Sequence, residues 1–251
     1  MTEPAAPAPG ASVSQILETA ARVFRGTLAK CLPLAMLAVL VAELPSLYWT
    51  ARGRALPQLG HPWPADPTWW TLSLLGAALA LYLSSAMMLQ QRSLIAGILC
   101  GSQAAMRAAL QRLPLLLASW VLAQASLLVG LVLLVLPGLF LLVCYMVMLP
   151  VVLFEHPSPG MVLIRCVVLV RPQWWKTLAA LVIAGIVVAV CVLVFAAILA
   201  ILAVVIPGAA FQAVAAACLV AFLAAALVFV SALALTLHSA ASHSASASSS
   251  A

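Results

Sequence analysis

Charged residues are scarce in this chain: 6% of its 251 residues are Asp, Glu, Lys or Arg, and 67% are hydrophobic. In an average soluble domain about a quarter of the residues are charged. So few charged side chains cannot cover a surface that faces water, and we therefore expect lipid to surround most of the chain. The formal net charge of +6 does not indicate nucleic-acid binding, because the basic residues are scattered and form no dense patch.

Residues that carry catalysis or bind metals are also few. The chain has five acidic residues and four histidines, and no two histidines have the spacing of metal ligands on a helix. Its six cysteines lie in or beside apolar runs and none belongs to a CxxC motif, so we interpret them as small packing residues. Zinc-protease, serine-hydrolase and phosphate-loop motifs are missing too. We therefore expect a protein that is not an enzyme and that has no catalytic residues, cofactor or metal site.

What the chain does contain is a series of apolar runs, most of them long enough for a hydrocarbon core of about 30 Å. We predict that these runs are transmembrane helices, because lipid offers no hydrogen-bond partners to an open backbone. Tight turns at Pro137-Gly138 and Pro207-Gly208 join two pairs of them. The predicted spans are approximately 28–47, 69–90, 113–136, 139–154, 174–206 and 211–237.

Amphipathic segments precede three of these runs and begin near Ser12, Ser102 and Pro159. Ser12 and Gln15 fit a capping box at the start of the first one. Together the segments indicate a weak repeat of surface helix, span, turn and span, up to three times. The predicted fold is thus an all-α integral membrane protein whose six transmembrane helices form three hairpins, with interfacial amphipathic helices on the cytoplasmic side. The expected organisation is a disordered tail at 1–11, a membrane domain at 12–238 and a disordered Ala/Ser-rich tail at 239–251.

The positions of the basic residues predict the orientation of these spans. With six spans, one side of the membrane receives nine basic residues, and the other side receives Arg52 and Arg54. The positive-inside rule then places the first group, and both chain termini, in the cytoplasm. The nine residues are Arg22, Arg25, Lys30, Arg92, Arg107, Arg112, Arg165, Arg171 and Lys176.

Small and weakly polar residues inside the spans predict how the helices pack. Small residues spaced four apart allow close approach of two helices, and hydroxyl or amide groups inside a span more often join helices than line a transport path. The small residues are Gly76 with Ala80, Ser126 with Gly130, and Ala217 with Ala221 and Ala225. The weakly polar residues are Ser84, Ser85, Ser119, Gln124, Ser126 and Ser231.

The most informative polar segment follows the fourth span. Ser158 can cap a helix that begins at Pro159, and Glu155 lies just before that start. We expect this helix to lie in the interface or to fold back against the bundle. In one interpretation an ion pair of Glu155 with an arginine fixes the helix in place. In the other, basic and aromatic residues form a lipid-headgroup site. The candidate residues are Glu155, Arg165, Arg171, Trp174, Trp175 and Lys176.

The same segment resembles a known family. Leu136-Pro137-Gly138, Glu155, Ser158-Pro159, Arg165, Leu169, Arg171 and Trp174-Trp175 look like the YciC-like family of uncharacterised bacterial inner-membrane proteins. They also resemble the membrane domain attached to some glycerophosphodiester phosphodiesterases. Cys166 stands where the family pattern has serine, and Pro172 where glycine is common. The resemblance implies a six-span protein of the bacterial inner (cytoplasmic) membrane and supplies no catalytic residue.

Two functions from different classes fit these features. The first is a non-catalytic scaffold or a component of envelope or lipid homeostasis, in contact with the bilayer and with a membrane-protein partner or a second copy. The second is a small transporter or permease-like protein for a lipid or an apolar solute, which needs few polar groups on its path. A continuous cavity lined by Ser84, Gln124 or Glu43 favours transport, whereas a solid, alanine-packed bundle favours the scaffold.

Overall fold

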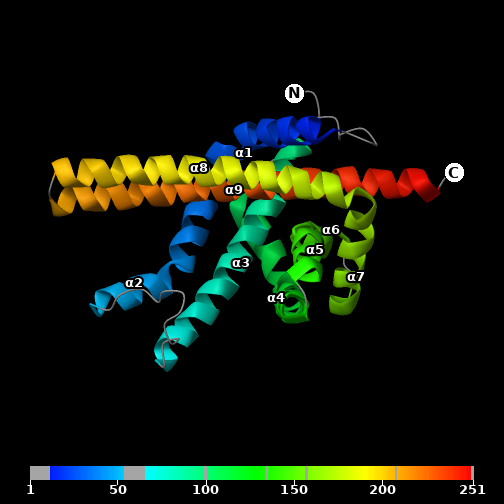
Figure 1. Cartoon of the computed structure of the whole chain (residues 1–251), viewed down its shortest axis with the longest axis horizontal. Helices are drawn as coiled ribbons and strands as arrows, with labels where there is room; N and C mark the ends of the chain where they lie inside the picture. The colour runs from blue at the N-terminus through cyan, green and yellow to red at the C-terminus, as the bar shows by residue number, and fades with distance from the viewer. Residues whose placement is uncertain are drawn as a thin grey trace.

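The structure is a computed structural model that describes residues 12–53, 66–98, 101–133, 135–155, 158–206 and 208–249. Throughout these ranges the chain is helical and contains no strand, which confirms the predicted all-α class. The helices, shown in Figure 1, are α1 (Val13–Ala42), α2 (Leu44–Ala51), α3 (Pro67–Ile95), α4 (Ser102–Leu133), α5 (Val135–Tyr145), α6 (Met148–Glu155), α7 (Pro159–Val170), α8 (Trp174–Val205) and α9 (Ala209–Ser249), with a 3-10 turn, η1 (Arg171–Gln173), between α7 and α8.

Long apolar helices dominate the described part of the chain. Five segments have the length and composition to cross a membrane: Val13–Ala42, Pro67–Ile95, Ser102–Val132, Pro159–Leu202 and Phe211–Ser242. A sixth is obtained if α5 and α6, which are bent by 44° at their junction, count as one broken span. Pro150 explains this break, because a proline cannot bond to the carbonyl four residues earlier, and Met146 lies in the intervening turn.

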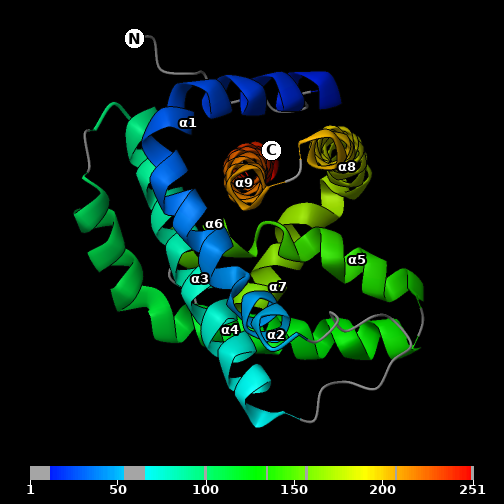
Figure 2. The same ribbon diagram turned by 90° about the vertical axis from the view of Figure 1, so that its left-hand side faces the viewer.

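Prolines also separate the amphipathic start of each predicted repeat from its long apolar helix. Pro33 lies inside α1 and Pro114 inside α4, and Pro172 lies in η1 between α7 and α8. Figure 2 shows that α1 and α4 change direction along their length, as expected of helices that contain a kink-forming residue. The first part of α1 begins at the predicted capping box of Ser12 and Gln15 and lies over α9, and its later part runs beside α3 (Figure 2).

Glycines allow close helix contacts at two of the predicted positions. A Cβ atom added to Gly76 would lie 2.9 Å from the carbonyl oxygen of Val41, and one added to Gly130 would lie 3.3 Å from the Cα of Gly138. The third prediction holds only in part: Ala217 is exposed, Ala221 and Ala225 are half-buried, and the most buried face of α9 carries Ala224, Val228 and Ala232. That face is buried because the middle of α9 packs against α1 and α3.

A buried hydrogen-bond network joins α1, α3 and α9. The amide of Gln91 is fully buried, donates to the carbonyl of Val228 at 3.1 Å and to Thr27 Oγ1 at 3.5 Å, and accepts from Ser231 Oγ at 2.7 Å. Gln91 of α3 thus bonds to both α1 and α9. Ser231, and Ser126 with its 2.8 Å bond to Tyr145, join helices as predicted.

The hairpin of α8 and α9 differs most from the expected arrangement. Figure 1 shows that it extends beyond the other helices and runs crosswise to α3, so the three predicted hairpins are not parallel. The change of direction occurs at η1, and the two helices contact each other through stacked Phe195 and Phe222, 4.8 Å apart. Apolar side chains remain exposed around α8, with Leu193 71% exposed. A helix that is apolar on all sides requires lipid or protein around it.

Two smaller expectations are also corrected. Pro137-Gly138 is not the predicted turn, because both residues lie in α5, which begins at Val135, and the first turn of a helix tolerates proline. The tail expected to be disordered is helical as far as Ser249, and Ala240 and Ala241 are buried. Alanine has the highest helix propensity, which allows α9 to continue. The other expected disordered tail, residues 1–11, lies outside the described residues.

Candidate functional site

Glu155, the last residue of α6, is bound by side chains from two other helices. One carboxylate oxygen accepts a hydrogen bond from Arg165 Nε of α7 at 2.7 Å, and the other lies 3.2 Å from His238 Nε2 of α9. The side chains of Glu155 and His238 are 23% and 14% exposed, and that of Arg165 is 45% exposed. We call these three residues the Glu155 cluster. It connects three helices through one acidic side chain that is mostly shielded from solvent.

The local sequence explains why Arg165 reaches Glu155. Pro159 occupies the first turn of α7, a position that proline tolerates, and α7 folds back against the bundle as predicted. Val162, Cys166 and Leu169 form its buried face, and Arg165 lies on the remaining, more exposed surface. Ser158 occupies the N-cap position without the predicted side-chain bond, and only its carbonyl accepts, from the Val162 N–H.

Aromatic and basic residues extend the cluster on one side. The ring of Phe154 lies 6.1 Å from the His238 ring, and the guanidinium of Arg92 lies over Phe154 at 3.8 Å from its centroid. Arg92 and Arg112 both line a pocket of about 340 Å³ next to Phe154. Arg92 comes from the end of α3 and Arg112 from α4. Together with α7, which carries Arg165, and α9, which carries His238, four helices meet the end of α6 in this region.

The structure divides the six predicted site residues between two places. Glu155 and Arg165 form the predicted ion pair. Trp174 stacks on Phe140 at 5.8 Å and meets Trp175 edge-on at 4.5 Å, in the first turn of α8. Trp175 is 75% exposed, Arg171 is exposed in η1, and Lys176 follows in α8. The predicted headgroup set therefore does not surround Glu155 as one group.

Sequence reasoning missed His238, Phe154 and Arg92 as members of this region. His238 is 83 residues from Glu155 along the chain, so no local spacing connects the two. The available signal was a single histidine near the end of an otherwise apolar helix, where burial of a titratable group requires a partner. For Arg92 the signal was weaker, since it resembled an ordinary basic residue at the end of a span.

A second polar group lies between α2 and α3. Asp66 caps α3 by accepting from the Thr68 N–H at 3.0 Å, and it also accepts from Tyr48 at 3.2 Å and Arg52 at 3.3 Å. Arg52 lies over the Tyr48 ring at 4.6 Å. The backbone bond from Thr68 is the main reason why the pKa of Asp66 is below its usual value, and the bond from Tyr48 and the charge of Arg52 contribute less. We call Asp66, Tyr48 and Arg52 the Asp66 cluster.

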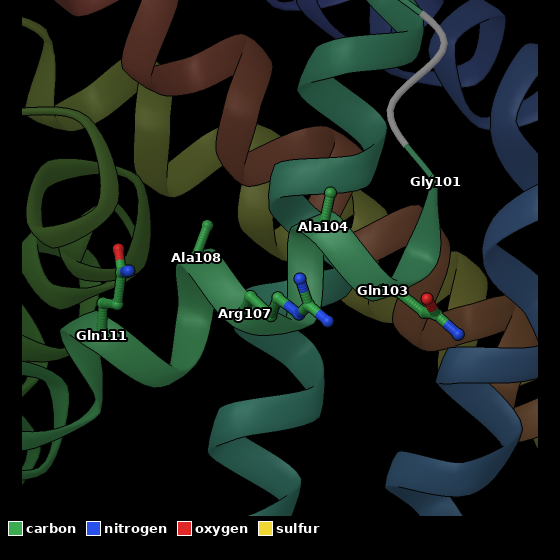
Figure 3. Close-up of a pocket in the computed structure, with 6 residues that line it drawn as sticks. All are labelled: Gly101, Gln103, Ala104, Arg107, Ala108 and Gln111. Carbon is green, nitrogen blue, oxygen red and sulfur yellow. The ribbon is translucent and has the colours of Figure 1, made fainter.

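A shallow pocket of about 520 Å³ follows the first turns of α4. Figure 3 shows that its labelled residues all come from this one segment, and that Gln103, Arg107 and Gln111 are spread along the helix and do not converge. The pocket therefore lacks the convergent polar groups of a ligand site. In the described part of the chain, no three His, Cys, Asp or Glu side chains are grouped so that they could hold a metal ion.

The fold and the Glu155 cluster together describe a class: an all-helical, apolar, multi-pass membrane protein whose helices are joined by a few polar contacts. Comparison with protein-family models, with curated proteins and with solved structures finds no match to this chain. The resemblance to the YciC-like family therefore stays a prediction.

Proposed function

We propose that this chain is a non-catalytic, six-span protein of the bacterial inner membrane, with both termini in the cytoplasm, that acts as a scaffold or in envelope and lipid homeostasis. The observation that carries the proposal is the Glu155 cluster. Its carboxylate connects α6 to α7 and α9, so this charged contact holds helices together. The resemblance to the YciC-like family supports the membrane location and the number of spans in this proposal.

The other polar residues of the spans support the same function. Ser126 bonds to Tyr145, and Ser231 bonds to Gln91, in both cases across two helices. The three residues suggested for a transport path are distributed over separate places. Ser84 is half-buried on α3, Gln124 is exposed on α4, and Glu43 is exposed at the end of α1. None of the three lines either of the two pockets described above.

The grouping of charges supports the proposed orientation. Arg92 and Arg165, both predicted to be cytoplasmic, lie close to Phe154 and Glu155 in one region. Arg52, predicted on the opposite side, pairs with Asp66 elsewhere. Charged residues on one side of a bilayer are expected to contact each other, and not to contact charged residues on the opposite side.

A lipid-scrambling assay tests the proposal against transport. The full chain is reconstituted in liposomes that carry a fluorescent phosphatidylglycerol, and dithionite quenches the outer leaflet. A scaffold leaves the inner half of the fluorescence protected, as in protein-free liposomes. Loss of that protection at a rate proportional to protein content contradicts the scaffold and favours the lipid transporter. Trapped calcein in the same vesicles controls for leakage.

A further inference from the structure

The pocket beside the Glu155 cluster combines two cations with apolar walls. Arg92 of α3 and Arg112 of α4 line it together with Ser93, and Leu89, Phe154 and Ile98, which follows α3, supply the apolar surface. Its volume of about 340 Å³ is within the range of small-molecule sites. The residues come from α3, α4 and α6, so the pocket depends on the assembled bundle.

The charges around this pocket are not balanced. Arg92, Arg112 and Arg165 lie in one region, and its one described carboxylate, Glu155, is already bound by Arg165 and His238. Of the other three described acids, Glu18 pairs with Arg22, Asp66 pairs with Arg52, and Glu43 is the C-cap residue of α1. Arg92 and Arg112 are close enough for their like charges to interact. An anion between them offsets this repulsion and accepts charge-assisted hydrogen bonds.

The geometry of the pocket favours a particular kind of anion. The guanidinium of Arg92 is held in place by the face of Phe154 at 3.8 Å. A guanidinium presents paired N–H groups that match phosphate oxygens better than an ammonium does. Leu89 and the exposed Ile98 extend the lining with apolar surface. Such a site fits a phosphate attached to a hydrocarbon chain, at the end of the helices where lipid headgroups are expected.

We propose that Arg92 and Arg112 bind the phosphate group of an anionic amphiphile, whose hydrocarbon part lies along Leu89 and Ile98. A glycerophospholipid headgroup and a free phosphate share this chemistry. The site rests on the proposed membrane location, but it does not require the scaffold role. It differs from the headgroup site suggested by the sequence, which used Arg165, Arg171 and the tryptophans of α8.

Native mass spectrometry of the full chain in neutral detergent measures the binding. Phosphatidylglycerol is titrated against wild type, R92Q/R112Q and the matched control R25Q/R107Q. The control removes two exposed arginines of the same predicted side that lie outside this pocket. The apparent dissociation constant rises about tenfold or more in R92Q/R112Q, because two charge-assisted contacts are lost, and less than about twofold in the control. An equal rise in both variants, or no rise in either, overturns the site.

Two further arms separate the sources of phosphate and guard against misfolding. Phosphatidylcholine and inorganic phosphate are titrated in parallel. Tighter binding of phosphatidylglycerol than of phosphatidylcholine identifies a lipid headgroup as the ligand. Equal binding of the two lipids, together with inorganic phosphate binding that is lost in R92Q/R112Q, identifies the free ion. Wild-type protein is also photo-crosslinked to phosphatidylglycerol with a photoactivatable acyl chain. Crosslinks within 89–98 and 148–155 support the site, and crosslinks confined to α8 and α9 overturn it. If scrambling occurs while these crosslinks form, the scaffold fails and the site stands.

Discussion

The Glu155 cluster and the Asp66 cluster each contain one acid held by an arginine, but they stabilise different levels of structure. The partners of Asp66 lie 18 residues away or less along the chain, and its carboxylate caps α3 and holds the adjoining end of α2. The partners of Glu155 lie 10 and 83 residues away and come from two other helices. The Asp66 cluster therefore stabilises the junction of α2 and α3, which are neighbours in sequence, whereas the Glu155 cluster joins α6 to α7 and α9.

The largest effect is expected from E155Q. The substitution weakens both contacts of the carboxylate and leaves the half-buried His238 and the more exposed Arg165 without a charged partner. We expect a loss of about 2–3 kcal/mol in the free energy of unfolding, at the low end for a buried pair because Arg165 is partly exposed. Thermal unfolding in detergent measures it. D66N is the matched control, and an equal effect of the two substitutions contradicts the distinction between the clusters.

A smaller effect is expected where packing, rather than a polar contact, holds α3 to α1. In G76A the new Cβ would lie 2.9 Å from the Val41 carbonyl oxygen, so the two backbones must separate. We expect a cost of about 1–2 kcal/mol, measured by the same unfolding assay. G26A is the control, because nothing lies within 4 Å of a Cβ there, and alanine favours a helix over glycine. Destabilisation by G26A to the same extent contradicts the packing explanation.

The local role of Asp66 predicts a modest pH dependence. The pKa of Asp66 in the folded chain is below its usual value. The stabilisation that it provides is therefore complete above the usual aspartate pKa of about 4 and is lost as the pH falls through the lower, folded-state value. Unfolding of wild type and D66N between neutral and acidic pH measures this. We expect the difference in the free energy of unfolding between wild type and D66N to shrink at acidic pH. A difference that grows at acidic pH contradicts the prediction.

The smallest expected effect is the coupling between the two clusters. They share no partner, so the stability changes of E155Q and D66N should add within measurement error. Within the Glu155 cluster, in contrast, E155Q and H238Q remove the same contact, and their combined effect should be smaller than the sum. Double-mutant cycles in the unfolding assay measure both quantities. Strong coupling between Glu155 and Asp66 contradicts their independence.

The sequence predicted the features that depend on local patterns. Hydropathy predicted the apolar helices, and the capping box at Ser12 matched the start of α1. One of the two interpretations of the Ser-Pro helix start was an ion pair of Glu155 with an arginine, and the structure identifies that arginine as Arg165. The sequence did not predict His238 as the other partner, because a contact between residues 83 positions apart depends on how α9 packs. It also did not predict that α8 and α9 run crosswise to α3 (Figure 1). Apolar helices without a polar face carry no signal for the direction in which they pack.

The long separation between Glu155 and His238 has a consequence for biosynthesis. Arg165 emerges from the ribosome only ten residues after Glu155, so the acid gains its first partner almost immediately. Its second partner, His238, follows 83 residues after Glu155 and belongs to α9. The cluster can therefore be completed only after α9 has been synthesised, and a chain truncated before His238 is left with an acid that has one of its two partners.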